Sequence, residues 1–375
     1  WDFNNTKPFY GKISPGCKLC GEGDWSCLFL TGKCNTNCFY CPSEQTEAGI
    51  PQTQGMEFAS VNDYNGYLKW AEFKGISITG GEPFLMKDKS LRYLTAVKRC
   101  LPKSYFWMYT NGILVEKDIL KKMADAGLDE LRFDISAVNY SLEKVRLASD
   151  YIPNVTIEIP AIPEDEKKVK AMLFDFVKAG TKYLNLHQMR CTSFNFRNLA
   201  SRGYTILHGE KPTVLESELM ALRILDYAEK EQIDLGINYC NYQYRNRFQK
   251  SGFRRKLAAN NSGVPVSVTK NGYLRISDGQ YVEDNNFCST QENYSYAGVL
   301  IEDAVKHDHN SNFNIGKKAY RWNYGEVMNF KKLSNIQQGD WQKVIKTQGK
   351  EIPNDEVLFR LWQYEFIEWE LRPYF

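Results

Sequence analysis

The chain of 375 residues lacks the features that mark membrane and secreted proteins. It has no run of about 18 apolar residues, the length that a transmembrane helix requires. Residues 1–5 have neither the basic nor the apolar region of a signal peptide. We therefore expect a cytoplasmic protein with no membrane partner.

Positive and negative residues are nearly balanced in the sequence. Its 48 Lys and Arg residues nearly balance 45 Asp and Glu residues, which leaves a net charge of +3. Residues 244–256 are basic with interleaved aromatics and could grip an acidic peptide, a phosphate or RNA, but such a run is more often one solvated helix face. The small net charge argues against a nucleic-acid partner.

Histidine is scarce, with four residues, whereas cysteine is plentiful, with ten. Six of the cysteines fall within residues 17–41. In a chain without a secretory signal, clustered cysteines indicate metal ligands rather than disulfides. With 43% apolar and 25% charged residues, the rest of the composition is that of an ordinary globular protein.

Short apolar runs alternate with amphipathic stretches through the first half of the chain. The expected strands are 26–30, 75–79, 105–109, 130–133, 155–159 and 183–186. Strand–helix units of this length favour parallel strands joined by right-handed crossovers. We predict an α/β fold with a partial (β/α)6 TIM-like barrel, open on one side, and keep a doubly wound sheet as the alternative.

The alternation weakens after residue 190. We expect a loop over 193–207, a helix over 216–231, a short strand over 233–238 and a hairpin over 266–279 that turns at Lys270-Asn271-Gly272. The predicted organisation is an N-terminal segment (1–25), a barrel core (26–190), helices after the core (191–260) and a C-terminal α+β substrate or lid region (261–375).

The strongest chemical signal is the spacing of Cys34, Cys38 and Cys41 in a loop that follows the first strand. Three thiolates so placed can hold three irons of a 4Fe–4S cube, which leaves the fourth iron without a protein ligand. An open metal position is typical of a catalytic site, because a substrate must reach the metal. A zinc site is the alternative, but zinc sites usually pair two Cys-x-x-Cys units or add His, and no His lies near these cysteines.

A second signal is Gly80-Gly81-Glu82-Pro83, which ends the strand after the cysteine loop. Glycines allow the backbone to approach a ligand closely, and their N–H and C=O groups can bind a charged amine. A Gly-Gly turn after a strand is common by itself. Its place one strand after the cysteine loop makes a functional role the better interpretation.

Polar residues also end the later strands. Asn111 follows the third strand, Asp134 and Ser136 follow the fourth, Glu158 lies in the fifth and His187 in the sixth. In parallel barrels the carboxyl ends of the strands build the active site, so these residues are candidates for cofactor binding. The plainer alternative is that some of them only cap helices or close turns.

Cys17 and Cys20 form a separate Cys-x-x-Cys pair, which is half of a metal site. Cys240 is the best candidate to complete it, because it ends a short strand just past the predicted barrel, and Cys288 and Cys191 are weaker candidates. We expect either an auxiliary iron–sulfur cluster or another metal here, with reduced thiols as the alternative.

The cysteine triad, with Tyr40 before its last member, resembles the signature of the radical S-adenosylmethionine (SAM) superfamily. Similarity also extends to a set of mostly archaeal proteins described as related to pyruvate formate-lyase activating enzyme. The segments that carry it are 15–42, 184–188, 198–204 and 238–240. In that pattern Cys17, Cys20 and Cys240 recur together, which supports grouping them.

The resemblance implies a reaction and places for its cofactors. A reduced 4Fe–4S cluster on the triad passes one electron to SAM, giving methionine and a 5'-deoxyadenosyl radical that removes hydrogen from a substrate. It implies that Gly80, Gly81 and Glu82 bind the methionine end of SAM and that Tyr40 packs near the adenine. It implies that Asp134 and Ser136 lie near the SAM carboxylate and ribose. Such clusters are oxygen-sensitive, so an anaerobic setting and a reductant such as flavodoxin or ferredoxin are expected.

The resemblance leaves the substrate open. The first hypothesis is an enzyme that abstracts hydrogen from a peptide, a protein or a small metabolite. A glycyl-radical-enzyme activase is ranked lower, because activases can be short and this chain has a long extension. A radical SAM methyltransferase, an RNA-modifying enzyme and, from a different class, a zinc-binding nucleic-acid module remain alternatives.

Overall fold

The structure is a computed structural model that describes residues 6–45, 49–54, 56–207, 211–259, 266–268 and 274–276. The predicted C-terminal region over 261–375 therefore lies outside the described residues, except for two short strands. These are β13 (Val266–Val268) and β14 (Leu274–Ile276), which pair antiparallel with Val266 opposite Ile276. They confirm the hairpin predicted over 266–279.

A ten-stranded sheet forms the centre of the described part. Seven of its strands are parallel and lie side by side in chain order: β2 (Trp25–Phe29), β5 (Gly75–Thr79), β6 (Tyr105–Thr110), β7 (Glu130–Phe133), β8 (Asn154–Pro160), β9 (Tyr183–His187) and β12 (Gly236–Cys240). The order never reverses, so the sheet has no switch point of the kind that defines a doubly wound fold. The predicted α/β fold is confirmed.

Short antiparallel strands complete the two edges of this sheet. β1 (Phe9–Tyr10) pairs with β12, and β3 (Gln52–Thr53) joins β2 to β4 (Met56–Glu57). The first six parallel strands match the predicted ones. β12 is a correction, because the strand predicted over 233–238 as a separate element begins at Gly236 and extends the same sheet beside β9.

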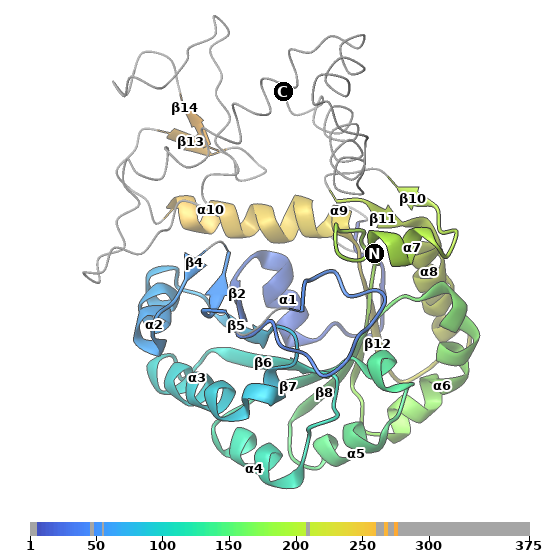
Figure 1. Ribbon diagram of the computed structural model, residues 1–375, viewed down its shortest axis with the longest axis horizontal. Coiled ribbons are helices and arrows are strands. Elements are labelled where there is room, and N and C mark those ends of the chain that lie inside the picture. The colour runs from blue at the N-terminus through green and yellow to red at the C-terminus, as the bar shows by residue number, and fades with distance from the viewer. Residues whose placement is uncertain are drawn as a thin grey trace, which may run out of the picture.

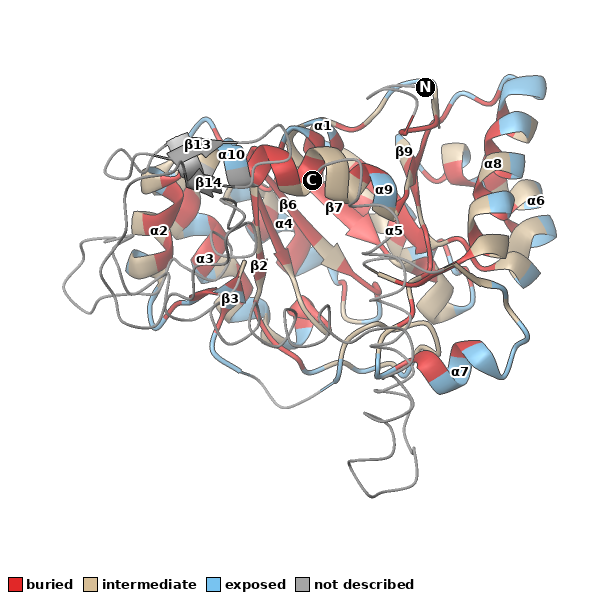
Figure 2. Ribbon diagram, turned by 90° about the horizontal axis from the view of Figure 1, so that it is seen from above, coloured by how far each residue is buried: buried red, intermediate tan, exposed pale blue. Residues whose placement is uncertain are grey.

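Helices cover the outer face of the sheet (Figure 1). They are α2 (Val61–Trp70), α3 (Lys87–Cys100), α4 (Lys117–Asp125), α5 (Glu143–Ser149), α6 (Glu166–Lys178) and α8 (Leu215–Lys230). Each is amphipathic, and in α4 the buried side chains are Ile119, Leu120 and Met123 on one face. Figure 2 shows buried residues along the strands and the inner helix faces, with exposed residues turned outward.

The space inside the curved sheet is filled by α1 (Pro15–Glu22), which begins with Ser14 accepting a hydrogen bond from the Cys17 N–H. A continuous helical segment crosses the open side of the sheet (Figure 1): α9 (Tyr242–Tyr244), the π-helix η4 (Arg245–Lys250) and α10 (Ser251–Ala259). Part of the predicted N-terminal segment (1–25), the helix α1, is thus an interior element of the fold.

Backbone contact between α1 and α10 allows no side chain at Gly23, which has a left-handed φ of 74°. A Cβ atom there would lie 2.1 Å from the Phe253 nitrogen. We expect Gly23→Ala to lower the free energy of unfolding by about 3 kcal/mol or more, because steric overlap adds to backbone strain. Gly203→Ala is the matched control: φ is 70° but no atom lies within 4 Å, so it should cost about 1 kcal/mol. Denaturant unfolding measures both, and equal losses would refute the close contact.

Candidate functional site

Three cysteines lie in the loop that follows β2. Cys34, Cys38 and Cys41 are half-buried, and none is in a disulfide. Thr36 lies between the first two, with its hydroxyl 3.2 Å from the Cys34 sulfur and 3.6 Å from the Cys38 sulfur. The Cys41 N–H donates to the Cys38 carbonyl at 3.0 Å. The loop therefore presents three free thiols in one short folded segment.

Three thiols suit a cluster better than a single ion. In a 4Fe–4S cube each thiolate binds a different iron, so three cysteines can hold the cube and leave one iron open. A structural zinc site needs four ligands around one ion. The set of three cysteines therefore fits the cube.

The Gly80–Gly81 turn after β5 supports this loop through its backbone. The Gly81 N–H donates to the Thr31 carbonyl and the Glu82 N–H to the Lys33 carbonyl, both at 2.7 Å. A Cβ atom on Gly81 would lie 2.1 Å from the Lys33 oxygen, so only glycine permits this approach. Since these N–H groups are used, the glycine carbonyls are the groups suited to accept hydrogen bonds from an amine.

Glu82 links the ends of two strands. Its side chain is fully buried and accepts hydrogen bonds from the Phe84 N–H (2.9 Å), the Thr110 hydroxyl (2.9 Å) and the Asn111 N–H (2.7 Å). Burial raises the pKa of this carboxyl above its ordinary value, although these hydrogen bonds oppose the shift. The contacts position the β5 and β6 ends, and contact between Glu82 and SAM stays a prediction.

Asn111 carries this linkage to the cysteine loop. Its amide nitrogen donates to the Asn35 side-chain oxygen at 2.6 Å, and its own oxygen accepts from the Ile113 N–H at 3.1 Å. Asn35 stands between the first two cysteines of the triad and was missed as a functional residue. Asn111 therefore positions the loop as well as facing the candidate site.

Three of the predicted cofactor-binding residues, Tyr40, Asp134 and Ser136, are in contact. The Tyr40 hydroxyl donates to the Asp134 carboxylate at 3.0 Å and lies 2.7 Å from the Ser136 hydroxyl oxygen. The Asp134 carboxylate also caps η2 (Ile135–Val138) by accepting from the Ser136 N–H. Burial raises the pKa of Asp134 despite these bonds. The three residues tie the cysteine loop to the carboxyl end of β7.

Glu158 and His187 form a second polar pair at the ends of β8 and β9. The His187 Nε2 lies 2.5 Å from one Glu158 oxygen, and the other oxygen is 2.8 Å from both Arg132 and Asn185. Burial alone would raise the pKa of Glu158, but Arg132 and His187 lower it well below its ordinary value. The His187 side chain is 30% exposed, so it is the member of the pair that a ligand can reach.

A buried charge network beneath this pair was missed in the sequence. Arg132 is 2% exposed and makes ion pairs with Glu130 (2.9 Å) and Glu158 (2.8 Å), and it lies over the Trp107 and Tyr109 rings. The sequence did contain a signal for this network. Glu130 and Arg132 occupy alternate positions of the predicted strand, so both side chains lie on one face of the sheet. The network fixes the inner face of the sheet against α1.

The three cysteines of the predicted second site all lie at the inner side of the fold. The buried Cys17 thiol accepts from the Asn185 amide at 3.1 Å and from the Asn238 amide at 3.7 Å. The Gln249 amide donates to Cys20, whose pKa is raised by burial and then by Cys240 and Cys17 nearby. Cys17, Cys20 and Cys240 therefore neighbour one another, but they do not converge on a single ion in the described part.

The segment predicted as a loop over 193–207 is a folded cover on the cysteine loop. It contains α7 (Phe196–Ala200) and β10 (Ile206–Leu207), which pairs with β11 (Thr213–Val214). Phe39 and Tyr40 pack against its small apolar core. The fully buried Asn195 amide donates to the Tyr40 and Arg190 carbonyls, both at 2.9 Å. This cover holds the loop at Tyr40, whereas Gly81 bonds to it at Thr31.

We expect Asn195→Ala to destabilise the chain by about 1–3 kcal/mol, because it leaves two carbonyls without donors. It should also lower the iron retained after gel filtration. Asn198→Ala is the matched control, since the exposed Asn198 makes only a 3.5 Å contact with the Phe39 carbonyl and should change stability by about 0.5 kcal/mol or less. Equal iron retention in both variants would show that the cover does not support the loop.

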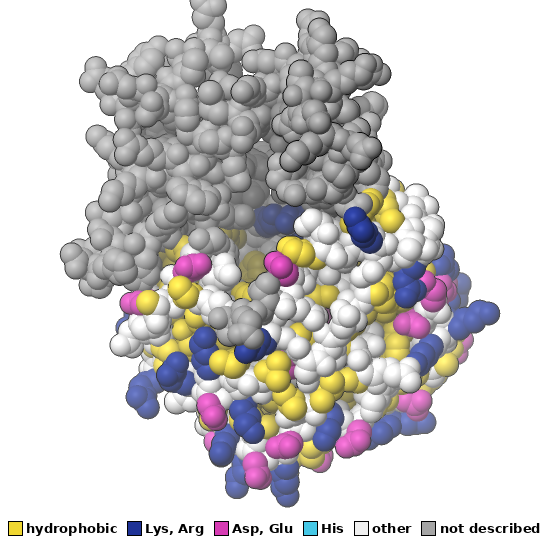
Figure 3. All heavy atoms as spheres, in the orientation of Figure 1, with side chains coloured by type: hydrophobic (Ala, Val, Ile, Leu, Met, Phe, Trp, Pro, Cys, Tyr) yellow, Lys and Arg dark blue, Asp and Glu magenta, His cyan; other side chains and the backbone are white. Residues whose placement is uncertain are grey.

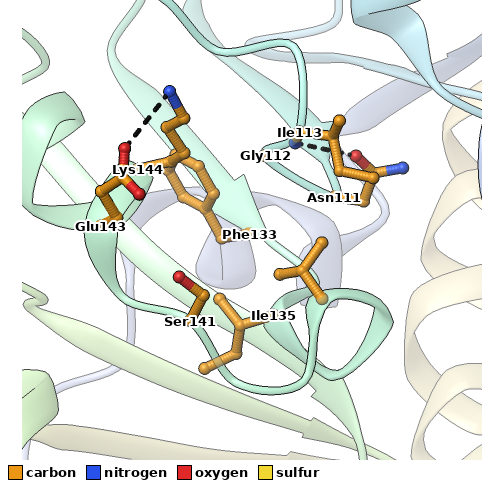
Figure 4. A pocket seen from close by; sticks show the side chains of 9 residues that line it. Asn111, Gly112, Ile113, Phe133, Ile135, Ser141, Glu143 and Lys144 are labelled. Carbon is orange, nitrogen blue, oxygen red and sulfur yellow. Dashed lines mark hydrogen bonds and ion pairs between the residues drawn. The ribbon is translucent and has the colours of Figure 1, made fainter.

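A pocket borders the site on its outward side (Figure 4). Phe133 and Ile135 form its apolar floor, and Asn111 belongs to its rim together with Lys144. The Lys144 ammonium lies 3.6 Å from Glu143 at the start of α5. The pocket therefore shares Asn111, which bonds to Asn35, with the candidate site.

The visible surface shows no gathering of one charge. In Figure 3, Lys and Arg side chains are interspersed with Asp and Glu over the described part of this face, with apolar groups between them. No helix among the described residues is long and apolar enough to span a membrane.

Known proteins are similar to this chain over most of its length or over its core. Residues 28–176 match the profile of the radical SAM superfamily. A Methanocaldococcus jannaschii protein named "Putative glycyl-radical enzyme activating enzyme" is 27% identical over 340 residues, which are 83% of this chain and 89% of that protein. A Rhodopirellula baltica GTP 3',8-cyclase is 30% identical over 115 residues, which are 30% of this chain and 31% of the cyclase.

Solved structures of radical SAM enzymes are similar at low identity. Streptococcus suis SuiB bound to precursor peptide SuiA has 11% identity and a TM-score of 0.45, covering 66% of this chain and 57% of that chain. Native anSMEcpe with bound AdoMet and Cp18Cys peptide has 16% identity and a TM-score of 0.33, covering 42% and 48%. The chain thus spans about half the length of these structures. The profile match over residues 28–176 and the long relative make this chain similar to the radical SAM superfamily.

Proposed function

We propose that the chain holds a 4Fe–4S cluster on Cys34, Cys38 and Cys41, cleaves SAM reductively and abstracts hydrogen from a substrate. The observation that carries this proposal is the bonding of the cysteine loop to three strand ends. The loop is tied to β5 through Gly81, to β6 through Asn111 and to β7 through Tyr40. Free thiols held against the carboxyl ends of parallel strands have the arrangement that a barrel active site needs.

The cofactors would supply the difficult chemistry and the protein the positioning. When bound, the reduced cluster would give SAM one electron, which yields methionine and a 5'-deoxyadenosyl radical. The Gly80 and Gly81 carbonyls would accept hydrogen bonds from the methionine amine. Tyr40, Asp134 and Ser136 would bind the nucleoside end, and Asn111 would fix the loop between them.

Glu158 and His187 would complete the SAM site or contact the substrate across from the glycines. The buried Glu158 stays ionised because Arg132 holds its pKa low, so it orients the more exposed His187 ring. A ring nitrogen of His187 would then meet a ligand in the mouth of the barrel. The substrate class remains a peptide, a protein or a small metabolite.

A glycyl-radical-enzyme activase is the second candidate. The length of the chain was the argument against it, but the relative whose name contains that activity matches 83% of this chain and is itself similarly long. Length therefore does not separate the two candidates. Mixing the reconstituted chain with a partner and finding a glycyl radical on that partner by electron paramagnetic resonance would favour the activase. No described contact favours a methyltransferase or an RNA-modifying enzyme.

Anaerobic reconstitution with iron and sulfide, followed by SAM and a reductant, tests the proposed function. The expected result is broad visible absorption and 5'-deoxyadenosine, identified by mass spectrometry. Absence of 5'-deoxyadenosine from a chain with a full cluster would reject the proposal.

We also propose that Cys20 and Cys240, with Cys17, hold an auxiliary iron–sulfur cluster or other metal, supported by their proximity at the inner side of the fold. Iron counting distinguishes the outcomes. About eight irons per chain would support a second cube, whereas about four would mean that these thiols stay reduced.

A further inference from the structure

Two arginines lie on one aromatic ring at the corner of the barrel mouth where β9 and β12 end. Arg190 follows β9, and Arg245 begins η4 after β12. Their guanidinium carbons lie 5.9 and 5.0 Å from the centroid of the Tyr242 ring. Both side chains are half-buried. The corner therefore concentrates two positive charges that water only partly solvates.

Neither guanidinium has a carboxylate partner in the part of the chain that the structure describes. Arg245 donates to the neutral Tyr242 hydroxyl at 3.0 Å and to the Gln249 side-chain oxygen at 3.3 Å. Arg132, by contrast, lies deeper and has two glutamates. Partial burial of a guanidinium is costly without an opposite charge, so the pair is suited to an anion from outside the chain.

Arg245 points toward the interior of the fold. Its pKa is raised above its ordinary value: burial lowers it, but Tyr242, Cys240 and Cys20 around the guanidinium more than offset that effect. Tyr109, on the inner face of β6, also acts on it. Arg245 therefore lies close to Tyr242, Cys240 and Cys20.

The backbone of Tyr242, whose ring both arginines contact, is anchored. The Tyr242 N–H donates to the Gln188 side-chain oxygen at 3.0 Å, and the Gln188 N–H donates to the Cys240 carbonyl at 3.2 Å. The acid at this corner is Glu218, which accepts from the Gln188 amide at 3.4 Å and whose pKa is raised by burial. The contacts of Glu218 are thus with Gln188, not with the arginines.

This corner is separate from the predicted SAM site. Gly80 and Gly81 follow β5, and three strands (β6, β7 and β8) lie between β5 and β9 in the sheet. His187 is the nearest predicted site residue, because it pairs with Cys240 in the register of β9 and β12. The corner therefore lies away from the glycines and beside Cys240 and Cys20, two cysteines of the proposed second metal site.

We propose that Arg190 and Arg245 bind an oxyanion group of the substrate, a carboxylate or a phosphate, at the β9–β12 corner. Planar guanidinium groups match both oxyanions with paired, charge-assisted hydrogen bonds. The assignment to a substrate rests on the proposed function. The anion site itself can be tested without it.

Calorimetric titration of the reconstituted full-length chain with inorganic phosphate, and separately with succinate, tests the proposal. We expect Arg190→Gln and Arg245→Gln each to weaken binding of the preferred probe about tenfold or more. Arg245→Lys should retain part of the affinity, because it keeps the charge. Arg223→Gln is the matched control: Arg223 lies on the outer helix α8, paired with Glu166, and its loss should leave probe affinity unchanged.

Preference for phosphate or for succinate identifies the oxyanion. Unchanged affinity in both Gln variants, or no binding of either probe to the wild type, would overturn the proposal. Loss of SAM affinity in step with probe affinity would also overturn it, because the pair would then serve the SAM carboxylate. A wild type that makes no 5'-deoxyadenosine but binds a probe through these arginines would reject the radical function and leave the anion site standing.

Discussion

Replacing Cys34 with alanine is expected to lower the rate of 5'-deoxyadenosine formation at least a thousandfold, which is about 4 kcal/mol. The variant has only two thiolates for the four irons. A second iron then has no protein ligand, so the cluster is not retained. Cys38→Ala and Cys41→Ala should behave alike, because the three thiols act as one set. Rates are measured by mass spectrometry after anaerobic reconstitution, together with iron content.

Cys100→Ala is the control for this prediction. Cys100 is also a free, half-buried thiol, but it ends α3 on the outside of the sheet. Its loss should leave iron content and rate near those of the wild type. A triad variant that retains four irons and full activity would show that another donor holds the cluster.

Replacing Arg132 with methionine is expected to lower the free energy of unfolding by about 3–5 kcal/mol near neutral pH, because it leaves the buried Glu130 and Glu158 without their positive partner. Arg223→Met removes a half-exposed partner of Glu166 and should cost about 1 kcal/mol or less. Urea titrations of the two variants and the wild type measure the difference. Equal small losses would show that the network contributes little.

The same variant should depend on pH in a defined direction. In the wild type the folded-state pKa of Glu158 lies below its unfolded value, near 4.5, so its contribution is present above that value and is lost as the pH falls through the folded pKa. Without Arg132, burial raises the folded pKa of Glu158 instead. The loss of unfolding free energy in Arg132→Met, relative to the wild type, should therefore be smaller at about pH 5 than at about pH 7. A loss of unfolding free energy that grows toward acid pH would contradict this account.

The sequence predicted the elements whose signals are local. The cysteine loop, the Gly80–Gly81 turn and six parallel strands could be located because spacing and apolar runs are properties of short segments. The choice of Asp134 and Ser136 as candidates followed from a general rule, since parallel strands present their carboxyl ends at one edge, whereas their contact with Tyr40 was not predicted.

The parts that were missed depend on contacts between distant segments. α1 is only eight residues long, so nothing local shows that it fills the inside of the sheet. Arg132 resembles a surface charge until Glu130 and Glu158 are placed around it. Asn195 lies in a polar stretch whose sequence predicts a loop. Its role depends on its hydrogen bond to the carbonyl of Tyr40, which is 155 residues away in the chain.

The electron paramagnetic resonance spectrum of the reduced, reconstituted chain, recorded with and without SAM, tests the central claim most directly. A cluster on Cys34, Cys38 and Cys41 has one iron that no residue of this chain occupies. The account predicts the signal of a reduced 4Fe–4S cluster that changes its g values when SAM is added. A cluster signal that stays unchanged at saturating SAM would contradict it.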